Sequence, residues 1–242
     1  MNTEDWQIRT GLLFGPENIL KLKNSHILVA GLGGVGGYAA EQLCRAGVGE
    51  LTLIDHDVVQ PSNRNRQIIA LTSTNGMKKT RAIAERLLQI NPELKLHLVE
   101  QFIDETNVSD VFTDRFDFMI DAIDTLSPKV ALLAEGVKKG LKIVSSMGSG
   151  GKIFPSFVQV CDIEKSHHCK FAAMVRKYLH RLNIRSGIQV VFSPEKVSKK
   201  AIQVTDGTGN KRSVAGTVSY MPAVFGCYCA AEVVKEIISF EE

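Results

Sequence analysis

Short apolar runs alternate with helix-like segments along the first 150 residues of the chain. Five runs are typical of buried strands, and three segments between them have the apolar spacing of amphipathic helices. The predicted strands are residues 26–30, 51–54, 94–99, 116–121 and 141–145, and the predicted helices are residues 35–46, 78–90 and 127–139. Strands that alternate with helices favour a mostly parallel sheet covered on both faces. We therefore predict an α/β fold with a Rossmann-like, doubly wound sheet.

The pattern is less regular after residue 150. Pro155 cannot donate to a central ladder, so residues 152–160 indicate an edge strand or an antiparallel ribbon. A basic helix over 170–182, a strand over 189–193, a mobile loop over 196–212 and an apolar helix over 222–238 follow. No repeat or low-complexity linker interrupts the chain. We expect one domain over 1–242, with a nucleotide-binding half (1–150) and a C-terminal half (151–242) that serves substrate binding or dimerisation through an antiparallel and helical elaboration.

The overall composition is ordinary for a globular protein. The 242 residues are 44% hydrophobic and 23% charged. No apolar run reaches the roughly 18 residues that span a membrane, and the N-terminus has no secretory apolar core. We therefore expect a cytoplasmic protein without a membrane partner.

The five cysteines do not form a recognisable framework. Their odd number, their scattered spacing and the lack of a Cys-x-x-Cys pair argue against disulfides and against a four-cysteine zinc site. We expect Cys44, Cys227 and Cys229 to pack in the core, and Cys161 and Cys169 to be exposed.

The net charge of +3 is unevenly distributed. Residues 1–151 hold 16 Lys and Arg against 18 Asp and Glu, whereas residues 152–212 hold 12 against 4, an excess of +8. Such a local excess indicates a polyanionic partner for this segment, and a solvated basic surface is the alternative.

A glycine-rich loop, Gly31-Leu-Gly-Gly-Val-Gly36, follows the first predicted strand and opens the first predicted helix. Gly31, Gly33, Gly34 and Gly36 would let the backbone approach phosphates, whose charge the helix N-terminus attracts. Asp55 follows the second strand, where an acid accepts hydrogen bonds from a ribose. On its own, this pattern is typical of a dinucleotide-binding enzyme.

The segment Asn63-Arg64-Asn65-Arg66-Gln67 changes this interpretation. A dinucleotide site needs no such polar and cationic cluster after the second strand. A site that holds a triphosphate and releases pyrophosphate does need fixed cations. The sequence therefore favours a site for ATP.

Five motifs stand in one order between residues 31 and 124, and together they resemble the ubiquitin-activating-enzyme superfamily. The superfamily pattern is Gly-x-Gly-Gly-x-Gly, Asp-x-Asp, Asn-x-x-Arg-Gln, a lysine that opens the next helix, and Asp-x-x-Asp. The matching positions are 31–36, 55–57, 63–67, Lys79 and 121–124.

Further matches make the chain similar to the tRNA threonylcarbamoyladenosine dehydratase branch of this superfamily. They are Arg9-Thr-Gly-Leu-Leu-Phe-Gly15, Pro128-Lys129, Gly148-Ser-Gly-Gly-Lys-Ile-Phe-Pro155 and residues 216–234. The resemblance implies ATP-dependent adenylation of the threonyl carboxylate on the modified adenosine at tRNA position 37. The carbamoyl group then closes onto that carboxylate, with net loss of water.

The resemblance also implies roles for single residues. Arg66 and Lys79 would neutralise the charge that develops as pyrophosphate leaves, and Asp124 would hold Mg²⁺ on the phosphates. Arg9 would reach the neighbouring subunit's triphosphate, which implies a homodimer. A monovalent cation, K⁺ or Na⁺, is a further cofactor candidate, and a cysteine-desulfurase system is a candidate partner.

The remaining polar positions would hold the nucleotide through neutral and ribose contacts. The predicted nucleotide-binding set is Gly31, Gly33, Gly34, Gly36, Asp55, Asp57, Asn63, Arg66, Gln67 and Lys79. Asp57 and Asp121 have an equally plausible structural role, because acids at strand ends often cap helices. His167 and His168 are adjacent and point in different directions, so we interpret them as part of a basic loop.

Two other functions remain open at this point. In the first, the chain adenylates the C-terminal carboxylate of a ubiquitin-like sulfur carrier. In the second, it is an NAD-dependent oxidoreductase, which would leave Arg66, Lys79 and Asp124 unexplained. The basic segment and the missing zinc cysteines argue against the sulfur-carrier alternative.

Overall fold

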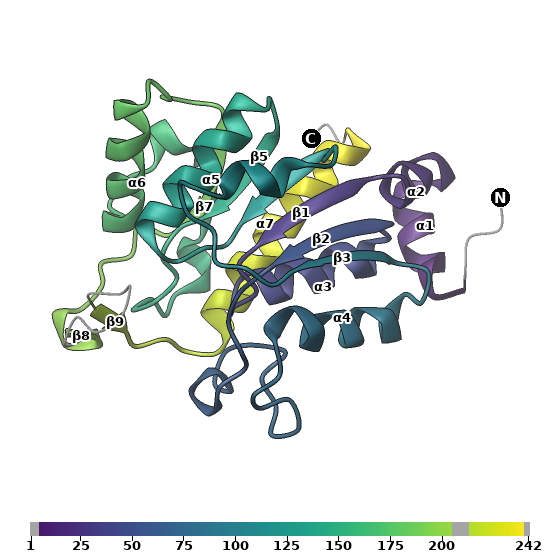
Figure 1. Cartoon of the computed structure of the whole chain (residues 1–242), viewed down its shortest axis with the longest axis horizontal. Helices are drawn as coiled ribbons and strands as arrows, with labels where there is room; N and C mark the ends of the chain where they lie inside the picture. The colour runs from purple at the N-terminus through teal and green to yellow at the C-terminus, as the bar shows by residue number, and fades with distance from the viewer. Residues whose placement is uncertain (1–4, 205–212, 240–242) are drawn as a thin grey trace.

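The fold is built on one seven-stranded sheet (Figure 1). The computed structural model describes residues 5–204 and 213–239. The sheet strands are β1 (His26–Ala30), β2 (Glu50–Ile54), β3 (Lys95–Val99), β4 (Phe118–Asp121), β5 (Lys142–Ser146), β6 (Gln159–Asp162) and β7 (Ile188–Phe192). Their order is β3-β2-β1-β4-β5-β7-β6, and every pairing is parallel except that of β6 with β7. The predicted α/β, Rossmann-like, mostly parallel sheet is confirmed.

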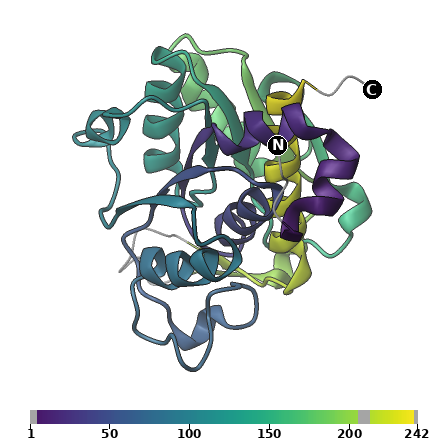
Figure 2. The same cartoon turned by 90° about the vertical axis from the view of Figure 1, so that its right-hand side faces the viewer.

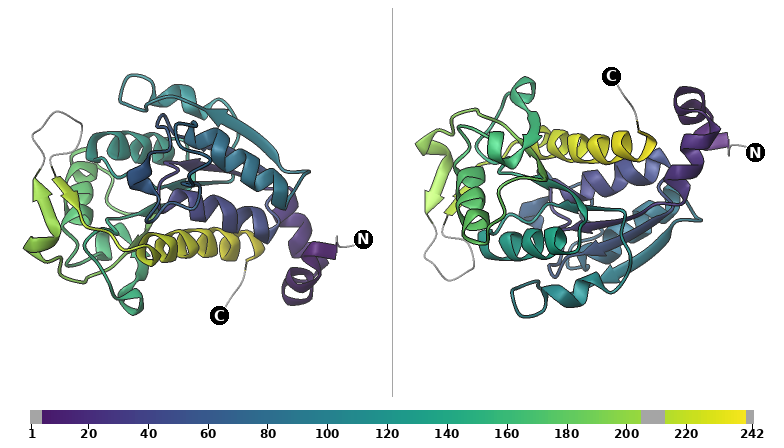
Figure 3. Two further views of the ribbon diagram at one scale, coloured as in Figure 1. Left: turned by 90° about the horizontal axis from the view of Figure 1, so that it is seen from below. Right: turned by 90° about the horizontal axis from the view of Figure 1, so that it is seen from above.

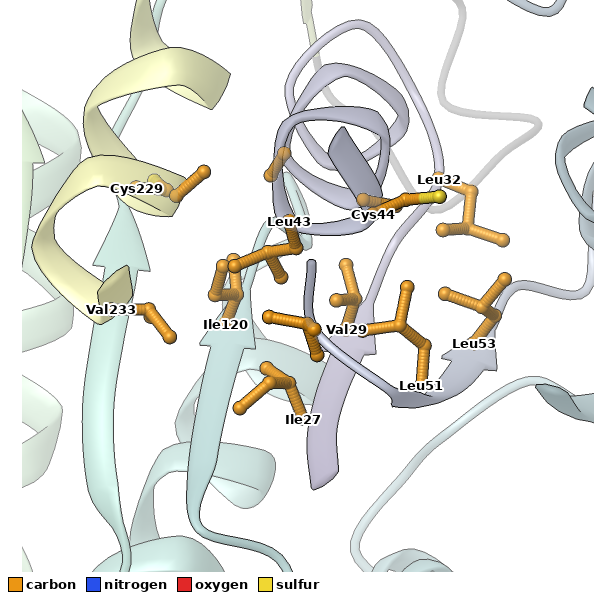
Figure 4. Packing of buried hydrophobic residues seen from close by; sticks show 14 of the residues in the cluster. Ile27, Val29, Leu32, Leu43, Cys44, Leu51, Leu53, Ile120, Cys229 and Val233 are labelled. Atoms are coloured by element: carbon orange, nitrogen blue, oxygen red, sulfur yellow. The ribbon is translucent and has the colours of Figure 1, made fainter. Parts of the chain in front are cut away.

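Helices cover both faces of the sheet, as expected for strands that are apolar on both sides. On one face, α2 (Pro16–Lys23), α3 (Gly36–Ala46), α4 (Lys79–Ile90) and α7 (Tyr220–Ile238) pack over one cluster of buried residues. On the other face, α5 (Leu126–Lys138) and α6 (Lys170–Arg181) pack over a second cluster. Figure 4 shows strand residues such as Val29 and Leu51 beneath Leu43 of α3, with Val233 of α7 beside them.

Close contact between α3 and α7 fixes the position of the glycine-rich loop. The two helices lie side by side on the sheet (Figure 3). Gly226 permits this, because a Cβ atom there would lie 2.5 Å from the backbone oxygen of Val35 at the start of α3. Gly47, in the left-handed conformation with φ 101°, ends α3 and turns the chain into β2.

Two N-terminal helices that the sequence pattern did not predict cover the end of the molecule where β1 begins (Figure 2). The first is α1 (Ile8–Phe14), and the second is α2. The amide of Gly49, just before β2, donates to Leu22 of α2 at 3.2 Å. These helices therefore sit at the amino ends of the strands.

The C-terminal half departs from the sequence prediction in two places. The edge strand begins at Gln159, not at residue 152, because Pro155 opens a 3-10 turn over Pro155–Phe157. The predicted loop over 196–212 contains β8 (Ile202–Val204), which pairs with β9 (Ser213–Ala215) in a separate antiparallel sheet. Residues 205–212 of that loop, with Lys211 and Arg212, lie outside the described residues.

Two of the cysteine predictions are also wrong. Cys169 is buried because it precedes α6 and faces the second core cluster. Cys227 is exposed, because it lies on the outer side of α7 while Cys229 faces inward. Among the described helices, none is long and apolar enough to cross a membrane.

Candidate active site

The candidate site lies at the carboxyl ends of β1, β2 and β4, as the strand assignments of the motifs predict. The chain leaves β1 towards β2 on one side and leaves β4 towards β5 on the other, so β1 and β4 flank the switch point of the sheet. Doubly wound sheets bind ligands at this point, outside the strand ends. Gly31 follows β1 and Ala122 follows β4, which places the first and last predicted motifs at the switch point.

The glycine-rich loop requires its glycines. Gly31 adopts φ +84°, and a Cβ atom on it would lie 2.8 Å from the backbone oxygen of Ala122. A Cβ atom on Gly36, the first residue of α3, would lie 1.7 Å from the backbone oxygen of Gly31. The loop therefore brings bare backbone to the start of α3, where unpaired amides and the helix dipole favour an anion.

Asp55 ties the glycine-rich loop to the end of β2. Its carboxylate is buried, and it accepts hydrogen bonds from the amide of Leu32 at 2.7 Å and from the amide of Asp57 at 2.8 Å. The Lys79 ammonium, at the first residue of α4, lies 3.9 Å from Asp55 and 2.7 Å from the more exposed Asp57. Lys79 is itself buried, so its charge is fixed in place at the site.

The segment 61–67 lies against the glycine-rich loop and extends below the sheet in Figure 1. A reciprocal pair of hydrogen bonds between Gln60 and Asn63 closes its short 3-10 helix, Pro61–Asn63. The Arg66 guanidinium donates to the Ser62 backbone oxygen and to the Asn65 side-chain oxygen. Within the described residues it forms no ion pair, so its charge is available to an anion.

Gln67 presents an unsatisfied buried group to the same loop. A Cβ atom built on Gly33 would lie 3.7 Å from the Gln67 side-chain nitrogen, and one built on Gly34 would lie 3.2 Å from the Arg66 backbone oxygen. Among the described residues, the Gln67 side-chain oxygen is the buried side-chain atom without a hydrogen-bond partner. Such atoms are rare in native proteins and point to a ligand or water.

The two acids of the motif at 121–124 occupy different environments. Asp121 is fully buried and accepts hydrogen bonds from the equally buried Lys129 ammonium and from the Ser145 hydroxyl at 2.6 Å. It also accepts from the amide of Ile123 at 3.1 Å, which fixes the loop between β4 and α5. Asp124, three residues on, is exposed at the strand ends.

The fold brings all the predicted site residues together except Arg9. The glycines, the acids, Arg66, Gln67 and Lys79 surround the switch point. Arg9 is exposed on α1, at the amino end of β1 and therefore at the far end of the strands (Figures 1 and 2). The roles assigned to these residues remain predictions.

Sequence reasoning missed two structural supports of the site. In the sequence, Lys129 stands out only as part of the matching pair Pro128-Lys129, because no local pattern marks a lysine as buried. Asn65 donates to the Thr217 backbone oxygen at 2.9 Å, which links the segment 61–67 to the chain just before α7. Its place between two arginines was a signal, but its partner lies far away in the sequence.

The donor set fits an adenine nucleotide with a divalent cation. The bare loop, the helix start, Arg66 and Lys79 suit phosphates, and the unsatisfied Gln67 oxygen marks a place for a polar partner. Asp124 offers the oxygen ligand that Mg²⁺ prefers.

Comparisons with known proteins agree with this geometry. The chain matches the ThiF family over residues 6–242. It is 35% identical to the tRNA threonylcarbamoyladenosine dehydratase of Bacillus subtilis, over 95% of this chain and 93% of that protein. Two crystal structures of the Escherichia coli enzyme of the same name, one with ATP and one with AMP, superpose with TM-scores of 0.88 and 0.87 at 33% identity. They cover 99% and 98% of this chain, and each match covers 97% of the Escherichia coli chain. A family match that extends over nearly every residue, together with motifs that meet at one end of the sheet, places this chain in the ThiF family.

Proposed function

We propose that this chain is an ATP-dependent tRNA threonylcarbamoyladenosine dehydratase, a cyclic ligase. The observation that carries the proposal is the end-to-end similarity to enzymes of that name, in a chain whose fold gathers Arg66, Lys79 and the glycine-rich loop at one site. The substrate is the threonyl carboxylate of threonylcarbamoyladenosine at tRNA position 37.

The reaction has two steps whose atoms balance. A carboxylate oxygen attacks the α-phosphorus of ATP, and pyrophosphate leaves. The carbamoyl group of the same nucleoside then attacks the activated carbonyl carbon and gives up one proton, and AMP leaves with that carboxylate oxygen. The ring therefore forms with net loss of water, although no free water is released.

The cations of the site act on the phosphates. The Arg66 guanidinium can form two parallel hydrogen bonds to phosphate oxygens, and the fixed Lys79 ammonium neutralises charge on the leaving pyrophosphate. Asp57, which pairs with Lys79 in this structure, competes with the phosphates for that ammonium. Asp55 holds the loop and borders the ribose position.

Asp124 is the residue that would hold Mg²⁺, and the ion would supply positive charge to the phosphates. The position of Asp124 beyond the buried Asp121 supports this role, because the loop is anchored while its outer acid stays accessible. A monovalent cation, K⁺ or Na⁺, is a further proposed cofactor.

The active unit is a homodimer in this proposal. Arg9 lies too far along the strands to serve its own site, whereas a partner subunit could present it to the other site. The α1 residues Leu12 and Leu13 are 83% and 75% exposed, which is typical of apolar side chains that a partner covers. These leucines follow Arg9 by three and four residues on the same short helix and support contact there.

No cysteine is needed, because the nucleophile lies within the substrate. Burial raises the pKa of Cys161, and the neighbouring Asp162 carboxylate raises it further, so this thiol is a poor nucleophile at neutral pH. A sulfur-carrier adenylyltransferase is disfavoured by the end-to-end match to dehydratases. We further propose a cytoplasmic location, and a cysteine-desulfurase system stays a candidate partner.

The test is turnover of modified tRNA by the purified protein. With ATP and Mg²⁺, nucleoside mass spectrometry should show threonylcarbamoyladenosine converted to a product lighter by one water, with AMP and pyrophosphate formed alongside. A carrier protein with a Gly-Gly terminus is the matched control substrate and should not be adenylated. Formation of ADP and phosphate, or activation of the carrier alone, would refute the assignment.

A further inference from the structure

Helix α6 presents a continuous basic face. Residues 165–194, which include this helix, contain six Lys and Arg and no Asp or Glu, so no acidic side chain of this stretch offsets their charge. The inner side of α6 is fixed in the core by Ala172, Val175 and Leu179. Its outer side therefore carries charge that the packing of the fold does not need.

The exposed face combines cations with an aromatic ring. Lys170, Met174, Lys177, Tyr178 and Arg181 are all exposed, and their spacing places them along one side of the helix. The Arg181 guanidinium lies over the Tyr178 ring, 4.9 Å from its centroid. Arg185, four residues after the end of the helix, is also exposed. We call this set the α6 face.

The structure separates these cations from others in the basic segment. Arg176 is half-buried and donates to the backbone oxygens of Ile163, at 3.1 Å, and Ser166, at 2.9 Å, so it holds the preceding turn. Glu164, an acid near the face, pairs with His180 at 2.8 Å. The cations of the α6 face are exposed and therefore accessible to a partner, as are Lys165, Lys196, Lys199 and Lys200 of the same segment.

The α6 face starts beside the candidate active site. A Cβ atom on Gly148, just past the carboxyl end of β5, would lie 3.6 Å from Phe171 in the first turn of α6. The buried Lys129 ammonium lies 5.8 Å from the centroid of the Phe171 ring. From there a helix of 12 residues extends about 18 Å along the molecule. Figures 1 and 3 show α6 at the opposite end from α1, so an α1-mediated dimer leaves it uncovered.

We propose that the α6 face docks the anticodon arm of the tRNA substrate. Lys177, Arg181 and Arg185 contact backbone phosphates, and Tyr178, braced by Arg181, stacks on an unpaired loop base. Single-stranded RNA loops are recognised by such stacking on aromatic rings and guanidinium planes, and phosphates by fixed cations. This inference rests on the proposed function, because it assigns the docking surface for that substrate.

The experiment measures binding of an anticodon stem-loop RNA, with and without the threonylcarbamoyl group, over a series of salt concentrations. The test variant is Lys177→Gln/Arg181→Gln/Arg185→Gln. Its charge-matched control is Lys95→Gln/Lys138→Gln/Lys139→Gln, three exposed lysines at the amino ends of the strands. The α6 variant should weaken binding and flatten the log–log salt slope by up to about three units, whereas the control should keep the wild-type slope.

Tyr178 gives a second, charge-independent readout. Tyr178→Ala should weaken RNA binding by roughly tenfold, the scale of one lost base–aromatic stack, and Tyr178→Phe should keep wild-type affinity because the ring remains. Wild-type affinity and slope in the α6 triple variant would overturn the proposal. Binding of anionic vesicles in place of the RNA would also overturn it.

Failure of the docking proposal is distinguishable from failure of the proposed function. If the wild-type protein makes no cyclic nucleoside from modified tRNA, the proposed function fails. If it does make the cyclic nucleoside while the α6 variant binds RNA normally, only the docking surface is wrong.

Discussion

Lys129 allows the sharpest stability test of the site's architecture. Its side chain and that of Asp121 are both 0% exposed, and they form an ion pair under the loop that leads to Asp124. Asp121 also accepts from the Ser145 hydroxyl and the Ile123 amide. In Lys129→Met, the carboxylate keeps only these two neutral donors and loses the charge that compensates it.

Removing one partner of a buried pair costs about 3–5 kcal/mol, because the other charge stays buried. That is a large share of a typical stability of roughly 5–15 kcal/mol. For a chain of this size, about 2–4 °C is lost per kcal/mol, so the melting temperature should fall by roughly 6–20 °C. The matched control is Lys138→Met in the same helix. Lys138 is 73% exposed, and within the described residues its ammonium pairs with Glu135, which is 12% exposed, at 3.1 Å. Because this ammonium stays in solvent, its loss should cost about 1 kcal/mol or less.

Urea denaturation of both variants and of Lys129→Met/Asp121→Asn gives the measurement. The double variant replaces the pair with a neutral one and should recover most of the lost stability, because no uncompensated charge remains. The reasoning would be refuted if Lys129→Met unfolded at the same urea concentration as the Lys138→Met control. If the loss of stability in the double variant equalled the sum of the losses in the two single variants, the two side chains would not depend on each other, which would also refute the reasoning.

Three further outcomes are expected. Arg66→Ala and Lys79→Ala should each lower turnover about a hundredfold while circular dichroism shows the fold retained, and near-normal turnover would contradict their assigned roles. Mixing Arg9→Ala subunits with Asp124→Ala subunits should restore part of the activity if Arg9 acts across a dimer, whereas no recovery after confirmed subunit exchange would show that it does not. Burial raises the pKa of Glu41, but hydrogen bonds from its two arginine partners outweigh this and lower the pKa below its ordinary 4.5. Glu41→Gln should therefore destabilise the protein at neutral pH. The difference in urea midpoint between this variant and the wild type should shrink as the pH falls below 4.5. An equal difference at every pH would contradict this expectation.

The sequence pattern predicted the parts of the fold that depend on local periodicity. Strand β1 was predicted residue for residue, and the ends of β2 and β4 placed Asp55 and Asp121 at one edge of the sheet. The loops that follow parallel strands all lie at the same edge of the sheet. Motifs that are spread over residues 31–124 therefore lie close together in the fold. This is why the location of the candidate site could be predicted from the sequence alone.

What the sequence could not show depends on contacts between distant segments. The burial of Lys129 depends on Asp121 and Ser145, which belong to two other elements. The strand β8 exists only because it pairs with β9, and its own three residues carry too short a pattern to predict it. Cys169 is buried by tertiary packing, although it lies next to a basic helix.

The two acidic motifs of the site turn out to be built alike, which the spacing of their residues does not reveal. In each motif the first acid is buried and accepts from the amide two residues on, Asp55 from Asp57 and Asp121 from Ile123. Each is also approached by a buried lysine of the following helix, Lys79 or Lys129.

The outer acid of each motif, Asp57 or Asp124, is exposed at the strand ends. A fixed inner acid and an accessible outer acid separate two tasks that conflict in one residue. A carboxylate that anchors a loop must keep its protein partners, whereas one that meets a nucleotide or a cation must be able to exchange them. The two lysines differ for the same reason. Lys129 is enclosed with its acid and serves the fold, whereas Lys79 lies between an inner and an outer acid, where an incoming phosphate can compete for it.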